Sequence, residues 1–270
     1  MSTLERRVRS IFISDIHLGT RGCNATALLE FLREVQTDKL YLVGDIVDLW
    51  SMRRTFYWPQ EHNNVVRTIL GKAKHGTEVI FVPGNHDEDF REFAGSVFGN
   101  LRVERDCLHV TAQGERLLVL HGDEFDSVVK CSPWLAKLGS HAYDFSIEMN
   151  RHFNKIRRAF GYPYWSLSGY LKHRVKNAVS YISSFEQAVA HEAKRRGLDG
   201  VVCGHIHRPE ISRIADVLYC NDGDWVESCS ALVEDRNGRL SIWNWNEIRD
   251  SLVSAVPEAE AEAGALGEAA

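Results

Sequence analysis

Five short segments of the chain combine acidic, amide and imidazole side chains at close spacing. They are Asp15-Ile-His17, Gly44-Asp45-Ile-Val-Asp48, Gly84-Asn85-His86-Asp87, His121-Gly122-Asp123 and Gly204-His205-Ile-His207. Neutral imidazoles with carboxylates and an amide oxygen suit a borderline divalent metal such as Mn²⁺, Fe²⁺ or Zn²⁺, whereas oxygen ligands alone would favour Mg²⁺ or Ca²⁺. About seven candidate ligands exceed what one tetrahedral ion requires. The five segments together therefore predict a site for two divalent ions.

A pair of such ions would suit chemistry at phosphorus. Two ions roughly 3.5–4 Å apart can clamp a phosphoryl group and activate a water near neutral pH. In Asp-x-His and His-x-His, an extended chain would place both side chains on one side, because strand side chains repeat every two residues. The glycines of the segments would allow sharp turns and a close approach to an anion. Each pair alone is more often structural, so the prediction depends on the five segments occurring together.

Each of the five segments directly follows a predicted strand. The first third of the chain alternates strand and helix patterns, with strands at Ser10–Ser14, Leu40–Val43 and Glu78–Val82 and helices at Asn24–Gln36 and His62–Lys74. This order predicts a parallel sheet with right-handed crossovers, in an α/β fold. Because the carboxyl ends of parallel strands meet at one edge of a sheet, the candidate ligands should meet in one cleft.

The second half of the chain predicts hairpins and further strands. Ala112-Gln-Gly114 separates two strand patterns, Cys107–Thr111 and Glu115–Leu120, and Asp235-Arg-Asn-Gly238 indicates a final turn. The other strand patterns are Gly200–Cys203, Glu210–Ile214, Val217–Cys220, Ala231–Glu234 and Leu240–Trp243.

The segment from Ser127 to Leu198 has a different character. It holds 12 Lys and Arg against 4 Asp and Glu, although the chain of 270 residues has a formal net charge of −5. It predicts two or three long helices, and about 70 residues are too many for a loop. We therefore expect a catalytic body at 1–126 and 198–250, a helical lid insertion at 127–197, and a disordered tail at 257–270. The basic, aromatic lid could attract phosphates or lie on an anionic membrane, or it could be amphipathic helices with a solvated basic face.

Composition excludes several classes of protein. With 44% apolar and 26% charged residues, the chain is typical of a globular protein rather than a collagen or a disordered polymer. No apolar run reaches the roughly 18 residues that a membrane span needs, and the N-terminus has no signal-peptide pattern. The six cysteines form no C-x-x-C pair, which is typical of a reducing compartment. These features predict a cytoplasmic protein.

The five segments, in their order, resemble the motif series of the calcineurin-like metallophosphoesterases. The resemblance covers about Val8–Asp126 and Leu198–Trp245, and it implies a four-layer α-β-β-α sandwich. By this resemblance, Asp15, His17 and His207 would hold one metal, Asn85, His121 and His205 the other, and Asp45 would bridge them. His86 would stabilise charge on the phosphoryl group or protonate the leaving group. Asp48 would orient His86, although it could instead cap a helix.

Three segments are similar to those of a narrower branch, the UDP-2,3-diacylglucosamine diphosphatases of lipid A biosynthesis. They are Ser14-Asp-Ile-His-Leu18, Gly44-Asp-Ile-Val-Asp-Leu-Trp50 and Gly204-His-Ile-His-Arg-Pro209. This likeness implies Mn²⁺, a helical lid over a lipid-bearing sugar nucleotide, and peripheral contact with the cytoplasmic face of the inner membrane. One residue departs from the branch, because His86 stands where its better-known members have Arg. The departure leaves the exact substrate open.

Other functions remain as alternatives. The substrate could be another small phosphoester, cleaved by a phosphatase or phosphodiesterase. A nuclease is less favoured because the chain is acidic outside the insertion. A non-catalytic scaffold is disfavoured because all seven ligand positions and the pair of His86 and Asp48 are present.

Overall fold

The computed structural model describes residues 7–127 and 167–254. The chain divides into two compact units, one made of Met1–His121 with Leu198–Ala270 and the other of Gly122–Gly197. The second unit has nearly the same bounds as the insertion predicted at 127–197. Its role as a lid stays a prediction. Residues 128–166 of the insertion and the predicted disordered tail lie outside the described residues.

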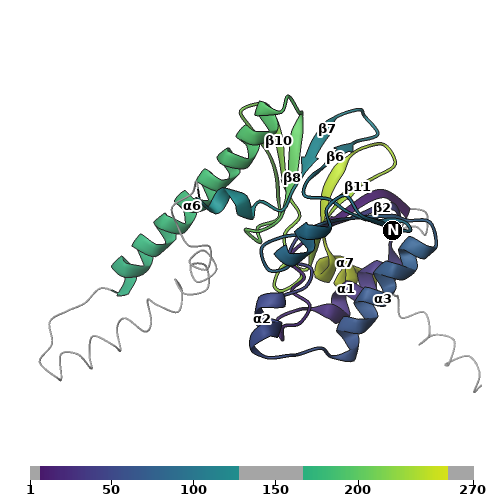
Figure 1. The fold of residues 1–270 in the computed structure, drawn as a ribbon. Helices are drawn as coiled ribbons and strands as arrows, with labels where there is room; N and C mark the ends of the chain where they lie inside the picture. Colours follow the sequence, from purple (N-terminus) through teal and green to yellow (C-terminus); the bar gives the residue numbers. More distant parts are fainter. Residues whose placement is uncertain (1–6, 128–166, 255–270) are drawn as a thin grey trace, which may run out of the picture. The chain divides into compact units, whose positions relative to one another are not determined.

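The described strands of the first unit form two sheets (Figure 1). In spatial order, the strands of the first sheet are β12 (Leu240–Asn244), β11 (Ser230–Glu234), β1 (Arg7–Ile13), β2 (Gln36–Val43), β3 (Glu78–Val82), β5 (Leu101–Val103) and β4 (Val97–Phe98). The strands β1, β2, β3 and β5 run parallel. At the edges, β11 pairs antiparallel with β1, β12 with β11, and β4 with β5.

The second sheet has a parallel centre with antiparallel edges. In spatial order its strands are β6 (Cys107–Val110), β7 (Arg116–Val119), β8 (Gly200–Cys203), β10 (Val217–Asn221) and β9 (Glu210–Ile214). The strands β7, β8 and β10 run parallel, while β6 pairs antiparallel with β7 and β9 with β10.

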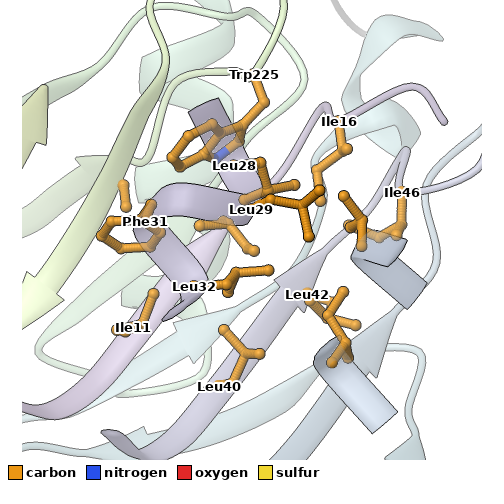
Figure 2. Packing of buried hydrophobic residues seen from close by; sticks show 14 of the residues in the cluster. Ile11, Ile16, Leu28, Leu29, Phe31, Leu32, Leu40, Leu42, Ile46 and Trp225 are labelled. Atoms are coloured by element: carbon orange, nitrogen blue, oxygen red, sulfur yellow. The ribbon is translucent and has the colours of Figure 1, made fainter. Parts of the chain in front are cut away.

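Three helices, α1 (Ala25–Glu34), α3 (Gln60–Lys74) and α7 (Trp245–Ser254), lie on one side of the first sheet (Figure 1). Helix α1 is amphipathic, and Asn24 caps it by accepting a hydrogen bond from the Ala27 N–H. Its buried leucines pack over the sheet together with Trp225 (Figure 2). The predicted helix ended too late, because the chain turns into β2 directly after Val35.

The other face of the first sheet packs against the second sheet. Phe12 and Tyr41 stack with ring centroids 4.5 Å apart, and they share a cluster with Val119 and Val202 of the second sheet. Neighbouring residues of β1 therefore serve two layers: Ile11 and Ile13 face the helices, whereas Phe12 faces the other sheet. The mixed α/β class, with two sheets and flanking helices, is confirmed.

Most predicted strands are confirmed, and both predicted hairpins form. The sequence prediction missed the short elements α2 (Leu49–Arg54), η2 (Glu88–Phe93), β4 and β5, and it missed α7. In the second unit, the structure describes the 3₁₀ helix η3 (Asp123–Ser127) and the long helix α6 (Leu167–Arg195). The five cysteines in the described part of the chain are free. None of the described helices has the length and apolarity that a bilayer span requires.

Candidate metal centre

The predicted metal ligands lie just beyond the carboxyl ends of five strands in the first unit. Asp15 and His17 follow β1, Asp45 follows β2, Asn85 follows β3, His121 follows β7, and His205 and His207 follow β8. The sequence predicted that these strand ends would meet in one cleft, and two sheets contribute them. The strands β1, β2 and β3 belong to the first sheet, and β7 and β8 belong to the second. The ligand segments therefore come from both sheets of the sandwich.

The backbone at these ligands is not extended. Five of them have a positive φ, in the left-handed region that residues other than glycine rarely adopt. They are Asp15 (50°), His17 (52°), Asp45 (53°), His205 (69°) and His207 (54°). The expectation that Asp-x-His and His-x-His share one side of an extended strand is therefore wrong. Tight left-handed turns aim these side chains, and strain of this kind concentrates at functional sites.

Asp15 is the centre of one group of candidate ligands. Its Oδ1 atom lies 2.8 Å from His207 Nε2 and 3.7 Å from His17 Nε2. Its Oδ2 atom accepts hydrogen bonds from the His205 N–H at 2.9 Å and the Ser14 hydroxyl at 2.6 Å. One oxygen of the buried carboxylate is thus held by the protein, and the other faces two imidazoles.

Asp45 lies between two sets of histidines. Its Oδ2 atom is 3.5 Å from His121 Nε2, 3.9 Å from His17 Nε2 and 4.0 Å from His86 Nε2. Its Oδ1 atom accepts a hydrogen bond from the His86 N–H at 2.8 Å. Asp45 belongs to one group of potential ligands with Asp15 and His121, and to another with His17 and His86. This central place suits a carboxylate that bridges two cations.

The remaining predicted ligands lie on the side of His121. His121 Nδ1 is 2.9 Å from the Val43 carbonyl oxygen, so the tautomer that donates there leaves Nε2 available to a metal. The rings of His121 and His205 are 5.1 Å apart. Asn85 Oδ1 is buried and has no hydrogen-bond partner among the described residues. A bound cation would satisfy this oxygen, so the residues present fit a divalent metal.

Three glycines leave the space that the ligands fill. A Cβ atom on Gly44 would lie 2.2 Å from His121 Nδ1, and one on Gly84 would lie 2.3 Å from Asp45 Oδ1. A Cβ atom on Gly204 would lie 2.2 Å from Ser14 Oγ. These glycines were expected to let the chain approach an anion. The structure shows a further role, which is to make room for the side chains of the site.

The close packing of charges shifts the pKa values of the ligands. Burial works to raise the pKa of Asp15, but His207 and His17 hold it well below its ordinary value. Burial works to lower the pKa of His17, but the neighbouring Asp15 and Asp48 raise it to about 10. Carboxylates and imidazoles therefore stabilise each other here, as they would stabilise a cation that displaces the imidazole protons.

Asp48 lies where both of the roles that the sequence allowed would place it. Its Oδ1 atom caps α2 by accepting a hydrogen bond from the Ser51 N–H at 2.7 Å. Its Oδ2 atom lies 3.0 Å from His86 Nδ1 and 3.2 Å from His17 Nδ1. Trp50, also on α2, lies against the His86 ring with centroids 4.5 Å apart. The first turn of α2 therefore holds the imidazole of His86.

Asp87 has a structural role that the sequence reasoning did not assign. It is fully buried, and its carboxylate accepts hydrogen bonds from the Gly84, Ile46 and Val47 N–H groups at 2.6, 2.7 and 3.2 Å. It thereby joins the loop after β2 to the loop after β3. Burial, aided by the charge of Asp45, raises the pKa of Asp87 to about 6. Its place at the end of the Gly84–Asp87 segment was the only signal of this role in the sequence.

Aspartates, histidines and an asparagine gathered at the strand ends of a two-sheet sandwich are a set of side chains that could hold divalent metals. Residues 8–209 match the calcineurin-like phosphoesterase family, and the chain belongs to that family. It is a metal-dependent phosphoesterase.

Relatives of the chain carry a narrower name. The chain is similar to a UDP-2,3-diacylglucosamine hydrolase of Xanthomonas oryzae pv. oryzae, with 29% identity over 85% of this chain and 96% of the relative. It is also similar to the protein of that name from Photorhabdus laumondii, with 24% identity over 76% of this chain and 84% of the relative. Among solved structures, it is similar to Yfce, a phosphoesterase from E. coli, with 17% identity over 88% of this chain and 99% of that one, at a TM-score of 0.43.

Proposed function

We propose that the chain hydrolyses a phosphoester or diphosphate bond of a lipid-linked sugar nucleotide resembling UDP-2,3-diacylglucosamine. The observation that carries the proposal is the buried convergence of side chains that suit two divalent cations. Asp15, His17 and His207 form one group of potential ligands, and Asp15, Asp45 and His121 form another. The name shared by the two relatives supports the choice of substrate.

The ligands divide between two cations, for which we propose Mn²⁺. Asp15, His17 and His207 would hold one cation, Asn85, His121 and His205 would hold the other, and Asp45 would lie between them. Cations bound there would polarise the phosphoryl oxygens and lower the pKa of the water that attacks phosphorus. The chain itself contributes the rigid placement of these side chains, because its turns and glycines fix each ligand before a cation binds.

His86 would assist the leaving oxygen as a general acid. Its Nδ1 atom faces Asp48, so its Nε2 atom is the nitrogen left for the substrate. The Nε2 atom lies 4.0 Å from Asp45 Oδ2, at the edge of the ligand cluster. The side chain of His86 is about one quarter exposed, at 26%, so a substrate can reach it. Asp48 holds the orientation of this imidazole at 3.0 Å, and a general acid has to be positioned toward the leaving oxygen.

The basic insertion would bring the anionic substrate to the centre. We propose that residues 127–197 form a lid that covers the lipid part of the substrate. We also propose that the protein works in the cytoplasm, in peripheral contact with the inner membrane. Deleting the insertion should abolish hydrolysis of the lipid-bearing substrate and spare a small aryl phosphate. Equal loss on both substrates would contradict a role in substrate selection.

A turnover screen with Mn²⁺-loaded protein tests the proposed function. UDP-2,3-diacylglucosamine should be the preferred substrate over simple UDP-sugars, phospholipid head groups, cyclic nucleotides and single-stranded DNA. A preference for DNA would replace the proposal with a nuclease, and a preference for another small ester would replace the substrate alone. If the protein stays metal-free after loading and hydrolyses no aryl phosphodiester, the chain is a scaffold.

A further inference from the structure

A single hydroxyl lies between two buried carboxyl groups behind the candidate metal centre. Ser14 Oγ is 2.6 Å from Asp15 Oδ2 and 2.7 Å from Asp222 Oδ1. The three side chains belong to residues that are at most 1% exposed. Asp222 comes directly after β10, in the second sheet, and Asp15 follows β1, in the first. No motif in the sequence analysis included Asp222 or gave a role to Ser14.

The number of protons fixes the direction of these hydrogen bonds. A hydroxyl carries one proton, so it can donate to only one of the two carboxyl groups and must accept from the other. Its third neighbour, the Gly223 carbonyl oxygen at 3.1 Å, can only accept and lies farther away than either carboxyl oxygen. Asp15 Oδ2 already accepts the His205 N–H, which makes Asp15 the acceptor. Asp222 must therefore carry a proton and donate it to Ser14, and Ser14 donates to Asp15. If both carboxyl groups were ionised, either the Ser14–Asp15 or the Ser14–Asp222 pair of oxygens would have no proton between them.

The surroundings of Asp222 agree with a neutral acid. Its Oδ2 atom is buried and has no hydrogen-bond partner among the described residues. An unpaired carboxylate charge would cost far more in such a place than an unpaired carbonyl oxygen. Burial, aided by the charge of Asp15, raises the pKa of Asp222 well above its ordinary value.

We propose that Asp222 is a positioning residue of the metal centre, which acts through the Ser14 hydroxyl to fix the Asp15 carboxylate. With Oδ2 held by Ser14 and His205, Asp15 turns its Oδ1 atom toward His207, where a cation would bind. This arrangement requires glycine at Gly204, because a Cβ atom there would lie 2.2 Å from Ser14 Oγ and 2.7 Å from Asp15 Oδ2. The inference rests on the proposed assignment of Asp15 as a metal ligand.

Binding of Mn²⁺ to the full chain tests the proposal, through the Kd measured by calorimetry. Asp222→Ala and Ser14→Ala should each weaken Mn²⁺ binding about 10- to 100-fold. The double variant should bind no more weakly than Ser14→Ala, because both residues act through one chain of hydrogen bonds. Asp222→Asn should bind within about threefold of the wild type, because its amide N–H can donate to Ser14 as the acid does.

Ser230→Ala is the matched control. Ser230, the first residue of β11, is buried and donates to the Asp222 carbonyl oxygen at 2.8 Å rather than to the Asp222 carboxyl group. Its Mn²⁺ affinity should equal that of the wild type. Thermal unfolding of each metal-free variant shows whether the variant folds. A lower Tm for Asp222→Ala with unchanged Mn²⁺ affinity would reduce Asp222 to a structural role and overturn the proposal.

The Asn variant decides where the proton lies. If Asp222→Asn loses as much Mn²⁺ affinity as Asp222→Ala, a neutral donor at this position is wrong and the proposal fails. Failure of the proposed metal site would look different, because the wild type itself would then bind no Mn²⁺, and failure of the proposed substrate would show only in the turnover screen.

Discussion

The geometry around His86 fits two roles, general acid and metal ligand. Its Nε2 atom lies close enough to Asp45 and His17 to form a third group of potential metal ligands. Its Nδ1 atom faces Asp48, and Trp50 covers one face of its ring. An imidazole held in this way could serve as an acid or as a ligand, and the two roles differ in what its removal does to bound metal.

The variant His86→Ala separates these roles. If His86 is a general acid, turnover of an aryl phosphate should fall by about 10²–10⁴. The amount of metal bound per chain, measured by elemental analysis, should stay as in the wild type. Loss of one metal equivalent would instead identify His86 as a ligand.

At the scale of the secondary-structure element, α2 depends on Asp48 for its start. Because Asn caps helices about as well as Asp, Asp48→Asn should keep the start of α2, and its free energy of unfolding should fall only by what the charge pairs with His86 and His17 contribute. It should nevertheless lower turnover, since the histidines lose their anionic partner. Asp48→Ala should lose both the cap and the partner, at a further cost of about 1 kcal/mol. Chemical denaturation and turnover of the two variants check this, and equal stability of both would contradict the capping role.

The loop after β3 has no space for a side chain at Gly84. An added Cβ would lie 2.3 Å from Asp45 Oδ1 and 2.7 Å from His121 Nε2. Gly84→Ala should therefore displace two candidate ligands and weaken Mn²⁺ binding by an order of magnitude or more, about the effect of losing a ligand's support. Gly71→Ala is the control, because Gly71 lies within α3 with no atom near its Cβ position. It should bind Mn²⁺ normally and gain about 0.5–1 kcal/mol in stability.

Sequence patterns predicted the longer elements well because their apolar residues repeat regularly. Helix α2 was not predicted, because it has only six residues and none of them is buried. The first half of β2 was also not predicted. Its four residues before Leu40 are polar, and only Thr37 among them is buried. The ligand types and their places after strands were readable from the sequence. The left-handed turns that aim the ligands were not, because local spacing cannot show which backbone strain the tertiary fold will support.

At the scale of the whole first unit, a buried polar network joins the two sheets. Glu234 of β11 is fully buried and accepts hydrogen bonds from the Ser10 hydroxyl at 2.8 Å and the Ala112 N–H at 2.8 Å. It pairs with Arg9 at 2.6 Å and with His109 of the second sheet at 3.0 Å. A satisfied charge of this kind stabilises the sandwich, whereas removing one partner is costly.

This network should make the stability of the fold sensitive to acid. Burial works to raise the pKa of Glu234, but His109, Ser10 and the Ala112 N–H lower it from 4.5 to about 2. A lowered pKa means that the folded state favours the carboxylate. The stabilisation is therefore complete above pH 4.5 and is lost as the pH falls toward 2. Its full size is on the order of 3 kcal/mol, and less than about half remains at pH 3.

Comparing the wild type with Glu234→Gln isolates this contribution. The difference between their free energies of unfolding, from urea titrations of the metal-free proteins, should be largest near pH 7 and should shrink as the pH falls to 3. Glu227 lies on the surface, so Glu227→Gln should show no such trend relative to the wild type. A difference for Glu234→Gln that stays constant from pH 7 to 3 would mean that Glu234 is held by packing rather than by its charge. The two sheets would then be joined mainly by the apolar layer around Phe12 and Tyr41.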